Sequence, residues 1–77
     1  MATTNRANPA TARLARLAAA DLAAARRDRD AAERRMIDAG RSDMSVRDYD
    51  AVRMAWIRAD AHVGVVLSRP LSYYRGR

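Results

Sequence analysis

The chain has 77 residues, with 15 basic and 9 acidic side chains, a formal net charge of +6, no cysteine and one histidine. A chain of this length forms one small domain, whose core contributes only a few kcal/mol unless a partner adds to it. The absence of cysteine excludes disulfides and thiolate metal sites, and the single His62 excludes a histidine-rich site, so we expect no metal and no cofactor.

Every basic residue is arginine, and alanine is abundant, which is typical of a GC-rich genome. From this we expect an actinobacterium or one of its phages as the source, with the protein in the bacterial cytoplasm or in a virion. The longest bulky apolar run, residues 63–67, is far shorter than the roughly 20 residues that cross a bilayer. We therefore expect no membrane-spanning segment.

The first helix is predicted over residues 9–39, after an N-terminal arm of residues 1–8. Asn8 can cap the first free amide, and Pro9 loses no hydrogen bond at the first helical position. No helix-breaking residue follows until Gly40, which is expected to end the helix in the left-handed conformation.

The second helix is predicted over residues 45–68. Ser45 and Asp48 have the spacing of a capping box, and Pro70 disfavours helical geometry at Arg69. The connection between the helices is short, so they must lie antiparallel as neighbours. The sequence predicts a single all-α domain, an antiparallel two-helix hairpin with flexible basic termini, of which residues 69–77 form a basic aromatic tail.

Both helices carry a repeat that suits close packing. Small residues recur every seventh position of the first helix, at Ala18, Ala25, Ala32 and Ala39, which we call the alanine seam. The second helix has larger residues at alternating spacings of three and four, which we call the core stripe: Tyr49, Val52, Trp56, Ala59, Val63 and Val66. We expect the core stripe to pack closely against the alanine seam. In this packing Trp56 lies above the gap between Ala25 and Ala32, and Leu67 contacts Leu17 or Ala18. The alternative is that the alanines reflect helix propensity alone.

The surplus positive charge lies at the two ends of the chain. Between Asp21 and Asp60 the sequence has nine arginines and nine acids, and pairs four residues apart, such as Arg26 with Asp30 and Arg34 with Asp38, are expected along the surface. An antiparallel hairpin brings the acid-free ends together at its open end. Candidate contacts to an anion or nucleic acid there are Arg6, Arg13, Arg16, Arg69, Tyr73, Tyr74, Arg75 and Arg77. The alternative for the tail is that it folds back over Leu14 and Leu17.

A second apolar surface lies on the second helix, away from its core stripe. Its residues are the candidate protein-interaction site: Val46, Met54, Ile57, Ala61, Gly64 and Val65. One neighbouring helix cannot cover both surfaces. We therefore expect self-association into a four-helix bundle, or docking on a larger protein, with a homodimer preferred.

Enzymatic chemistry has few candidates in this sequence. His62 falls on the polar side of the second helix, and no phosphate-binding glycine loop, metal-ligand spacing or nucleophile motif is present. A two-helix hairpin also has little concave volume for a small-molecule substrate. We expect a non-enzymatic interaction module, as in a phage assembly or host-takeover factor. The alternative is a nucleic-acid-binding protein, and no residue motif identifies a family.

Overall fold

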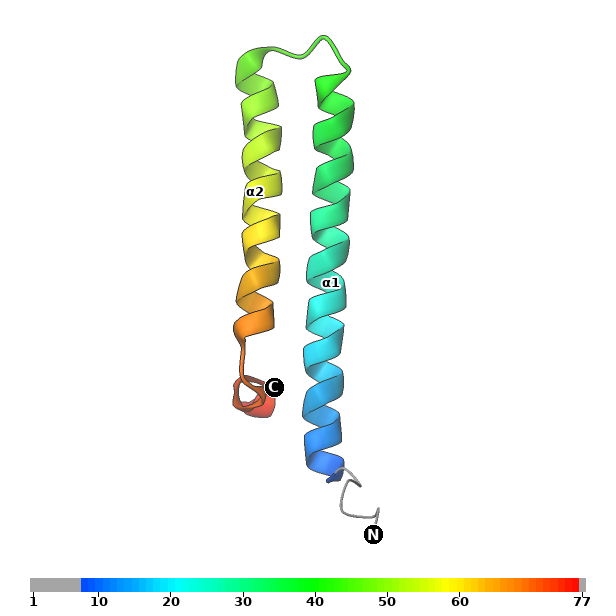
Figure 1. The fold of residues 1–77 in the computed structure, drawn as a ribbon, viewed down its shortest axis with the longest axis vertical. Helices are drawn as coiled ribbons and strands as arrows, with labels where there is room; N and C mark the ends of the chain where they lie inside the picture. The colour runs from blue at the N-terminus through cyan, green and yellow to red at the C-terminus, as the bar shows by residue number, and fades with distance from the viewer. Residues whose placement is uncertain (1–7, 77) are drawn as a thin grey trace.

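The computed structural model of the chain describes residues 8–76. Helices α1 (Pro9–Gly40) and α2 (Val46–Ser68) pack antiparallel, and a 3-10 helix, η2 (Leu71–Gly76), follows them. Helix η2 and the start of α1 lie at the end of the hairpin opposite the turn (Figure 1). The predicted all-α hairpin is confirmed. Its radius of gyration is 18.0 Å, against about 11.5 Å for a compact domain of this length, so most of each helix packs on one side only.

Helix α1 starts as predicted and ends differently. The Asn8 side chain accepts a hydrogen bond from the backbone N–H of Ala10 at 2.8 Å. At the other end the helix includes Gly40, and Arg41 continues in the right-handed region with φ of −95°. No glycine in the described part of the chain has a positive φ, so the predicted left-handed ending at Gly40 is wrong.

The last carbonyls of α1 are satisfied without a left-handed residue. The backbone N–H of Arg41 donates to the carbonyls of Asp38 and Ala39. Ser42 then donates twice to the Ala39 carbonyl, from its backbone N–H at 3.2 Å and from its hydroxyl at 2.9 Å. Because these bonds close the helix, Gly40 keeps helical geometry.

Helix α2 begins and ends where the capping residues predict. The Ser45 hydroxyl accepts a hydrogen bond from the backbone N–H of Asp48 at 3.1 Å. At the far end Arg69, which precedes Pro70, is extended with ψ of 127°. The boundaries therefore follow from local chemistry, since the serine satisfies a free amide and the proline restricts the residue before it.

The core lies along the line where the two helices meet. Ala25 and Ala32 are 3% and 2% exposed, Ala39 is also buried, and Ala18 is half-buried. Val63 and Val66 of the core stripe pack with Ala25 in one cluster, against which Leu22 lies. The alanine seam is therefore a packed surface, as predicted, rather than a consequence of helix propensity alone.

The register differs from the predicted one. Leu67 was expected to meet Leu17 or Ala18, but its side chain is 59% exposed. Asp21 of α1 reaches Arg69, beyond the end of α2, and Gly40 lies beside Tyr49. Both contacts place a residue of α1 opposite a later position in the chain than the predicted register does.

The residues after α2 fold back onto α1. Helix η2 packs against α1, its Tyr74 is 1% exposed, and Leu14 of α1 is also buried. The rings of Tyr73 and Tyr74 meet edge to face, with centroids 5.0 Å apart. The tail therefore packs back on α1 as far as Gly76, as one of the two interpretations expected, and this packing is compatible with exposed arginines.

Candidate interaction face and basic end

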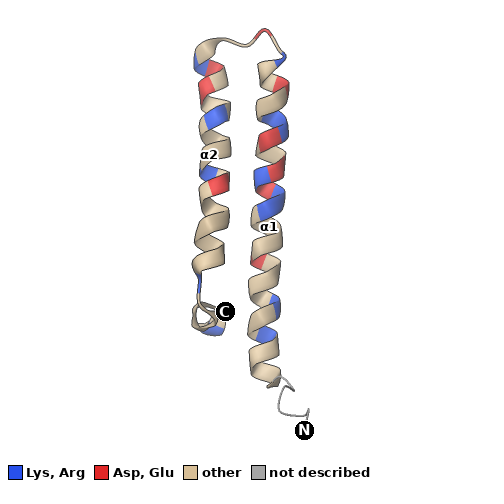
Figure 2. Cartoon of the chain, in the orientation of Figure 1, with Lys and Arg blue, Asp and Glu red and all other residues tan. Residues whose placement is uncertain are grey.

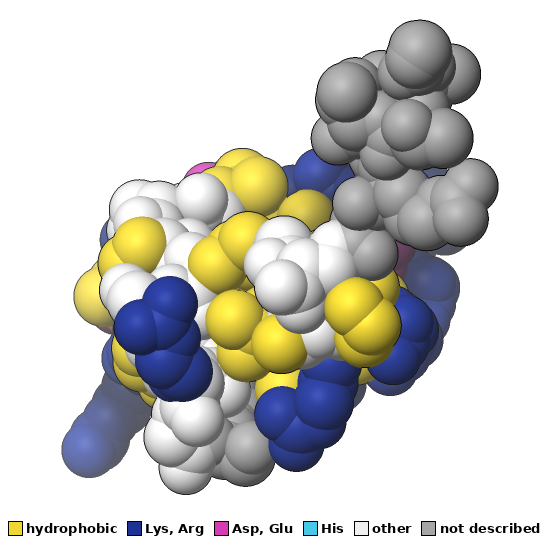
Figure 3. Space-filling model, turned by 90° about the horizontal axis from the view of Figure 1, so that it is seen from below, with side chains coloured by type: hydrophobic (Ala, Val, Ile, Leu, Met, Phe, Trp, Pro, Cys, Tyr) yellow, Lys and Arg dark blue, Asp and Glu magenta, His cyan; other side chains and the backbone are white. Residues whose placement is uncertain are grey.

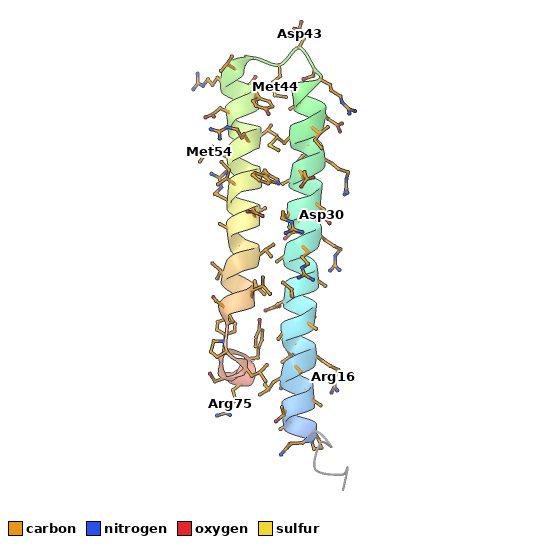
Figure 4. All side chains as sticks on the ribbon, viewed as in Figure 1. Arg16, Asp30, Asp43, Met44, Met54 and Arg75 are labelled. Carbon is orange, nitrogen blue, oxygen red and sulfur yellow. The ribbon has the colours of Figure 1, made fainter. Side chains whose placement is uncertain are left out.

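An apolar surface of α2 faces away from α1. Positions on a helix advance by about 100° per residue, which places five residues on the side roughly opposite the core stripe. We call them the outer face: Met54, Ile57, Ala61, Gly64 and Val65. Ile57 and Val65 are 36% and 51% exposed, Ala61 and Gly64 are exposed, and Met54 is half-buried. Figure 4 shows Met54 projecting from the side of α2 that faces away from α1.

Val46 is separated from the rest of the predicted interaction site. It is 86% exposed at the first position of α2, and two polar residues, Asp50 and Arg53, occupy the turns between it and Ile57. These two form an ion pair, with the Arg53 Nη2 atom 2.9 Å from the Asp50 Oδ1 atom. The structure therefore groups five of the six predicted residues and leaves Val46 at the turn.

Arg47 and Arg58 lie along one edge of the outer face, next to Val65 and Met54 on the helix surface. Both are exposed. Neither has a carboxylate within 4.0 Å among residues 8–76. Neither residue was predicted as a contact, although their spacing of eleven residues places both on one side of a helix.

Two shallow hollows lie at the turn end of the hairpin. They have volumes of about 320 and 350 Å³, and Ala39, Ser42 and Met44 line both. Met44 lies at the turn, near the ends of the two helices (Figure 4). Val46 and Tyr49 complete one hollow, so its lining is mainly apolar and lacks a paired nucleophile and base.

The charges are distributed as the sequence predicts, with both signs in the middle and a basic open end. Figure 2 shows mixed charges along the upper half of α1 and mainly basic residues near η2. Seen from the open end, arginine side chains surround a largely apolar surface (Figure 3). Arg13, Arg16 and Arg75 are exposed at this end, whereas Arg6 and Arg77 lie outside the described residues. Arg16 and Arg75 project in different directions, so they do not converge on one point (Figure 4).

Two of the predicted anion-contact residues make contacts within the fold. The Arg69 Nη1 atom lies 3.3 Å from the Asp21 Oδ2 atom, and the Arg69 guanidinium stacks 4.4 Å from the centre of the Tyr73 ring. Tyr74 is buried in the core, so its ring is not accessible for stacking on a base. Tyr73 is 47% exposed, and its ring contacts both the Arg69 guanidinium and the Tyr74 ring. The burial of Tyr74 therefore contradicts its predicted contact with a base, whereas the anion contact of Arg69 stays a prediction.

Surface ion pairs follow a different pattern from the predicted one. In the described chain, none of the expected pairs four residues apart on α1 closes within 4.0 Å. Arg29 instead approaches its neighbour Asp30 at 3.6 Å and reaches across to Asp60 of α2 at 3.9 Å. The arginine side chain is long enough to reach carboxylates on its own helix and on the neighbouring one.

The remaining polar candidates give no chemical site. His62 is exposed on α2, as expected, and no group of three or more potential metal ligands occurs among residues 8–76. Within the same residues the Trp56 indole N–H is buried without a hydrogen-bond partner. Neither long helix is both long and apolar enough in the described chain to cross a membrane. Comparison with protein-family models, curated proteins and solved structures finds no match to this chain.

Proposed function

We propose that this protein is a non-enzymatic interaction module that binds another helix through the outer face of α2. The observation that supports this is that α2 is apolar on two opposite sides, while only its core stripe packs against α1 and its outer face is largely exposed. A helix of this kind is typically interior to a larger bundle. The bound helix comes from a second copy or from another protein, in a bacterial or phage setting that the arginine-rich, alanine-rich composition supports.

Burial of the outer face against another helix would add apolar contacts to a hairpin whose own core is small. Burying the exposed parts of Ile57 and Val65 would each contribute about 1 kcal/mol. Gly64 has no neighbouring heavy atom within 4 Å of the place where a Cβ would be. A second helix can therefore approach closely along this line, with Ala61 and Gly64 presenting the least bulk.

The test places a charge on the outer face. Ala61→Arg introduces a long cationic side chain there, and Ala23→Arg, the same substitution at an exposed position of α1, is the matched control. We expect the wild-type chain either to exceed its 8.6 kDa monomer mass in light scattering or to retain a partner from the source cells. Ala61→Arg should lose that association and Ala23→Arg should keep it, with unchanged helical circular dichroism in both.

The proposal fails under a clear set of results. A wild-type chain of monomer mass, with the same co-purifying proteins as the Ala61→Arg variant, would show that the outer face binds nothing. Loss of association in both variants would point to charge or folding effects rather than to this surface.

A second candidate is nucleic-acid binding at the open end. The observation that favours it is that Arg13, Arg16 and Arg75 are exposed where α1 begins, and α1 has no acid in its first turn. Arginines in this setting neutralise phosphates, so affinity for DNA or RNA should fall steeply with salt. Arg16→Ala and Arg75→Ala should each reduce the salt slope by about one. Absence of binding at about 50 mM salt rejects this candidate.

A further inference from the structure

We infer that the helix bound by the outer face belongs to a different protein and carries Asp or Glu beside its apolar stripe. This inference rests on the proposed function and specifies the partner. Towards the start of α2, Asp50 lies in line with the middle of the outer face and pairs with Arg53 at 2.9 Å, so these two charges neutralise each other. Along one edge of the face, Arg47 and Arg58 are exposed and have no carboxylate within 4.0 Å among the described residues.

Antiparallel self-pairing of this face would bring like charges together. In a twofold-symmetric dimer, residues near the axis meet their own copies. The middle of the outer face lies between Ile57 and Ala61, so an antiparallel pairing of two copies through this face places Arg58 close to the Arg58 of the second copy. Like charges that meet in this way oppose association. The net charge of +6 on each chain adds to the repulsion.

A helix with acidic edges meets the same surface without that conflict. Met54 to Val65 spans 11 residue steps, or about 16 Å of helix at 1.5 Å per residue. Arg47 extends the basic edge by two further turns towards the start of α2. The complementary partner is therefore a helix of about 20 residues, with small or aliphatic residues at spacings of three and four and carboxylates on the flank that faces Arg47 and Arg58.

The strength of the charge preference follows from the exposure of the edge. Solvent-exposed ion pairs each contribute a few-fold to affinity. Two such pairs predict about a ten-fold preference for an acidic partner over a basic one, and the preference should shrink at high salt because exposed charges are screened.

The experiment uses the full chain and two synthetic 21-residue amphipathic peptides. Both have the same leucine and alanine stripe, and the flanking positions are glutamate in one and lysine in the other. Binding is followed by fluorescence anisotropy of the labelled peptides at about 50 mM and about 500 mM salt. We expect the glutamate peptide to bind about ten-fold more tightly at low salt.

Charge reversal provides the matched control. The double variant R47E/R58E should reverse the preference between the two peptides. The double variant R27E/R34E changes the net charge by the same amount at exposed positions of α1 and should leave the preference unchanged. Reversal by both variants would mean that net charge, and not the edge of the outer face, selects the peptide, which overturns the inference.

The outcomes separate this inference from the proposed function. Equal binding of both peptides, or a wild-type dimer that Ala61→Arg dissociates, overturns the acidic partner and leaves the interaction face in place. A monomeric chain that binds neither peptide, and on which Ala61→Arg has no effect, overturns both.

Discussion

The alanine seam can be tested by enlarging one of its residues. Ala25 is buried against Val63 and Val66, with Leu22 beside them. Leucine adds three carbon atoms to alanine. If a gap were present, their burial would stabilise the fold by about 2.4 kcal/mol, at about 0.8 kcal/mol for each carbon. Because the helices are in contact at this point, we expect overpacking instead, with a loss of about 1–3 kcal/mol for Ala25→Leu.

The assay is thermal and urea denaturation followed by circular dichroism at dilute protein. A loss of this size lowers the melting temperature of a domain of this length by about 4–24 °C. Ala23→Leu, two residues earlier on the exposed side of α1, is the control and should change stability by less than about 0.5 kcal/mol. If Ala25→Leu matches Ala23→Leu or raises the melting temperature, the seam is not the close contact described above.

Three further substitutions address the turn, η2 and the outer face. Ser45→Ala removes the acceptor for the Asp48 backbone N–H and should lower the free energy of unfolding by about 1 kcal/mol in urea titrations; an unchanged midpoint would mean that the cap contributes nothing. Tyr74→Ala should cost about 3–5 kcal/mol because its ring is buried, whereas Tyr73→Ala on the exposed neighbour should cost far less, and equal losses would contradict the packing of η2. Gly64→Ala should raise the melting temperature of the isolated chain, since alanine favours a helix by about 1 kcal/mol and its Cβ meets no atom within 4 Å; a lower melting temperature would show that the site is not open.

Local chemistry made much of the hairpin predictable from the sequence. Asn8, Ser45 and Pro70 act on the residues next to them, so the boundaries of both helices follow within about one residue. The seven-residue alanine repeat is also local information, because a helix places every seventh residue on nearly the same side. Ala25 and Ala32 were identifiable as buried for this reason.

The features that could not be predicted from the sequence are those for which several contacts of similar strength were possible. Gly40 permits a left-handed ending, but hydrogen bonds from Arg41 and Ser42 close the helix in another way. Arg69 looks like a free basic residue in sequence, and only the fold places it 3.3 Å from Asp21, far away in the chain. The same applies to the register, which contacts between residues far apart in the chain determine.

Helical periodicity predicted part of the outer face correctly. Ile57, Ala61 and Val65 were predicted to share one surface, because spacings of three and four align on a helix. The predicted surface also included Val46, which shares the direction but is cut off by the ion pair of Asp50 and Arg53. The side of the helix on which each residue lies was thus predictable. Whether the apolar surface is continuous depends on the side chains that lie between these residues.

Under the proposed function, folding and binding are linked in this hairpin, because α2 would take part in both. The described chain has seven buried hydrophobic residues, and three of them are alanines that bury only a methyl group beyond the backbone. A ligand that binds only the folded state adds about 2.7 kcal/mol at a concentration of 100 times its Kd, which corresponds to a rise of about 11–22 °C in melting temperature for a domain of this length. A helix that binds the outer face should therefore stabilise the chain. The glutamate peptide should raise its melting temperature more than the lysine peptide does, and R47E/R58E should reverse that order.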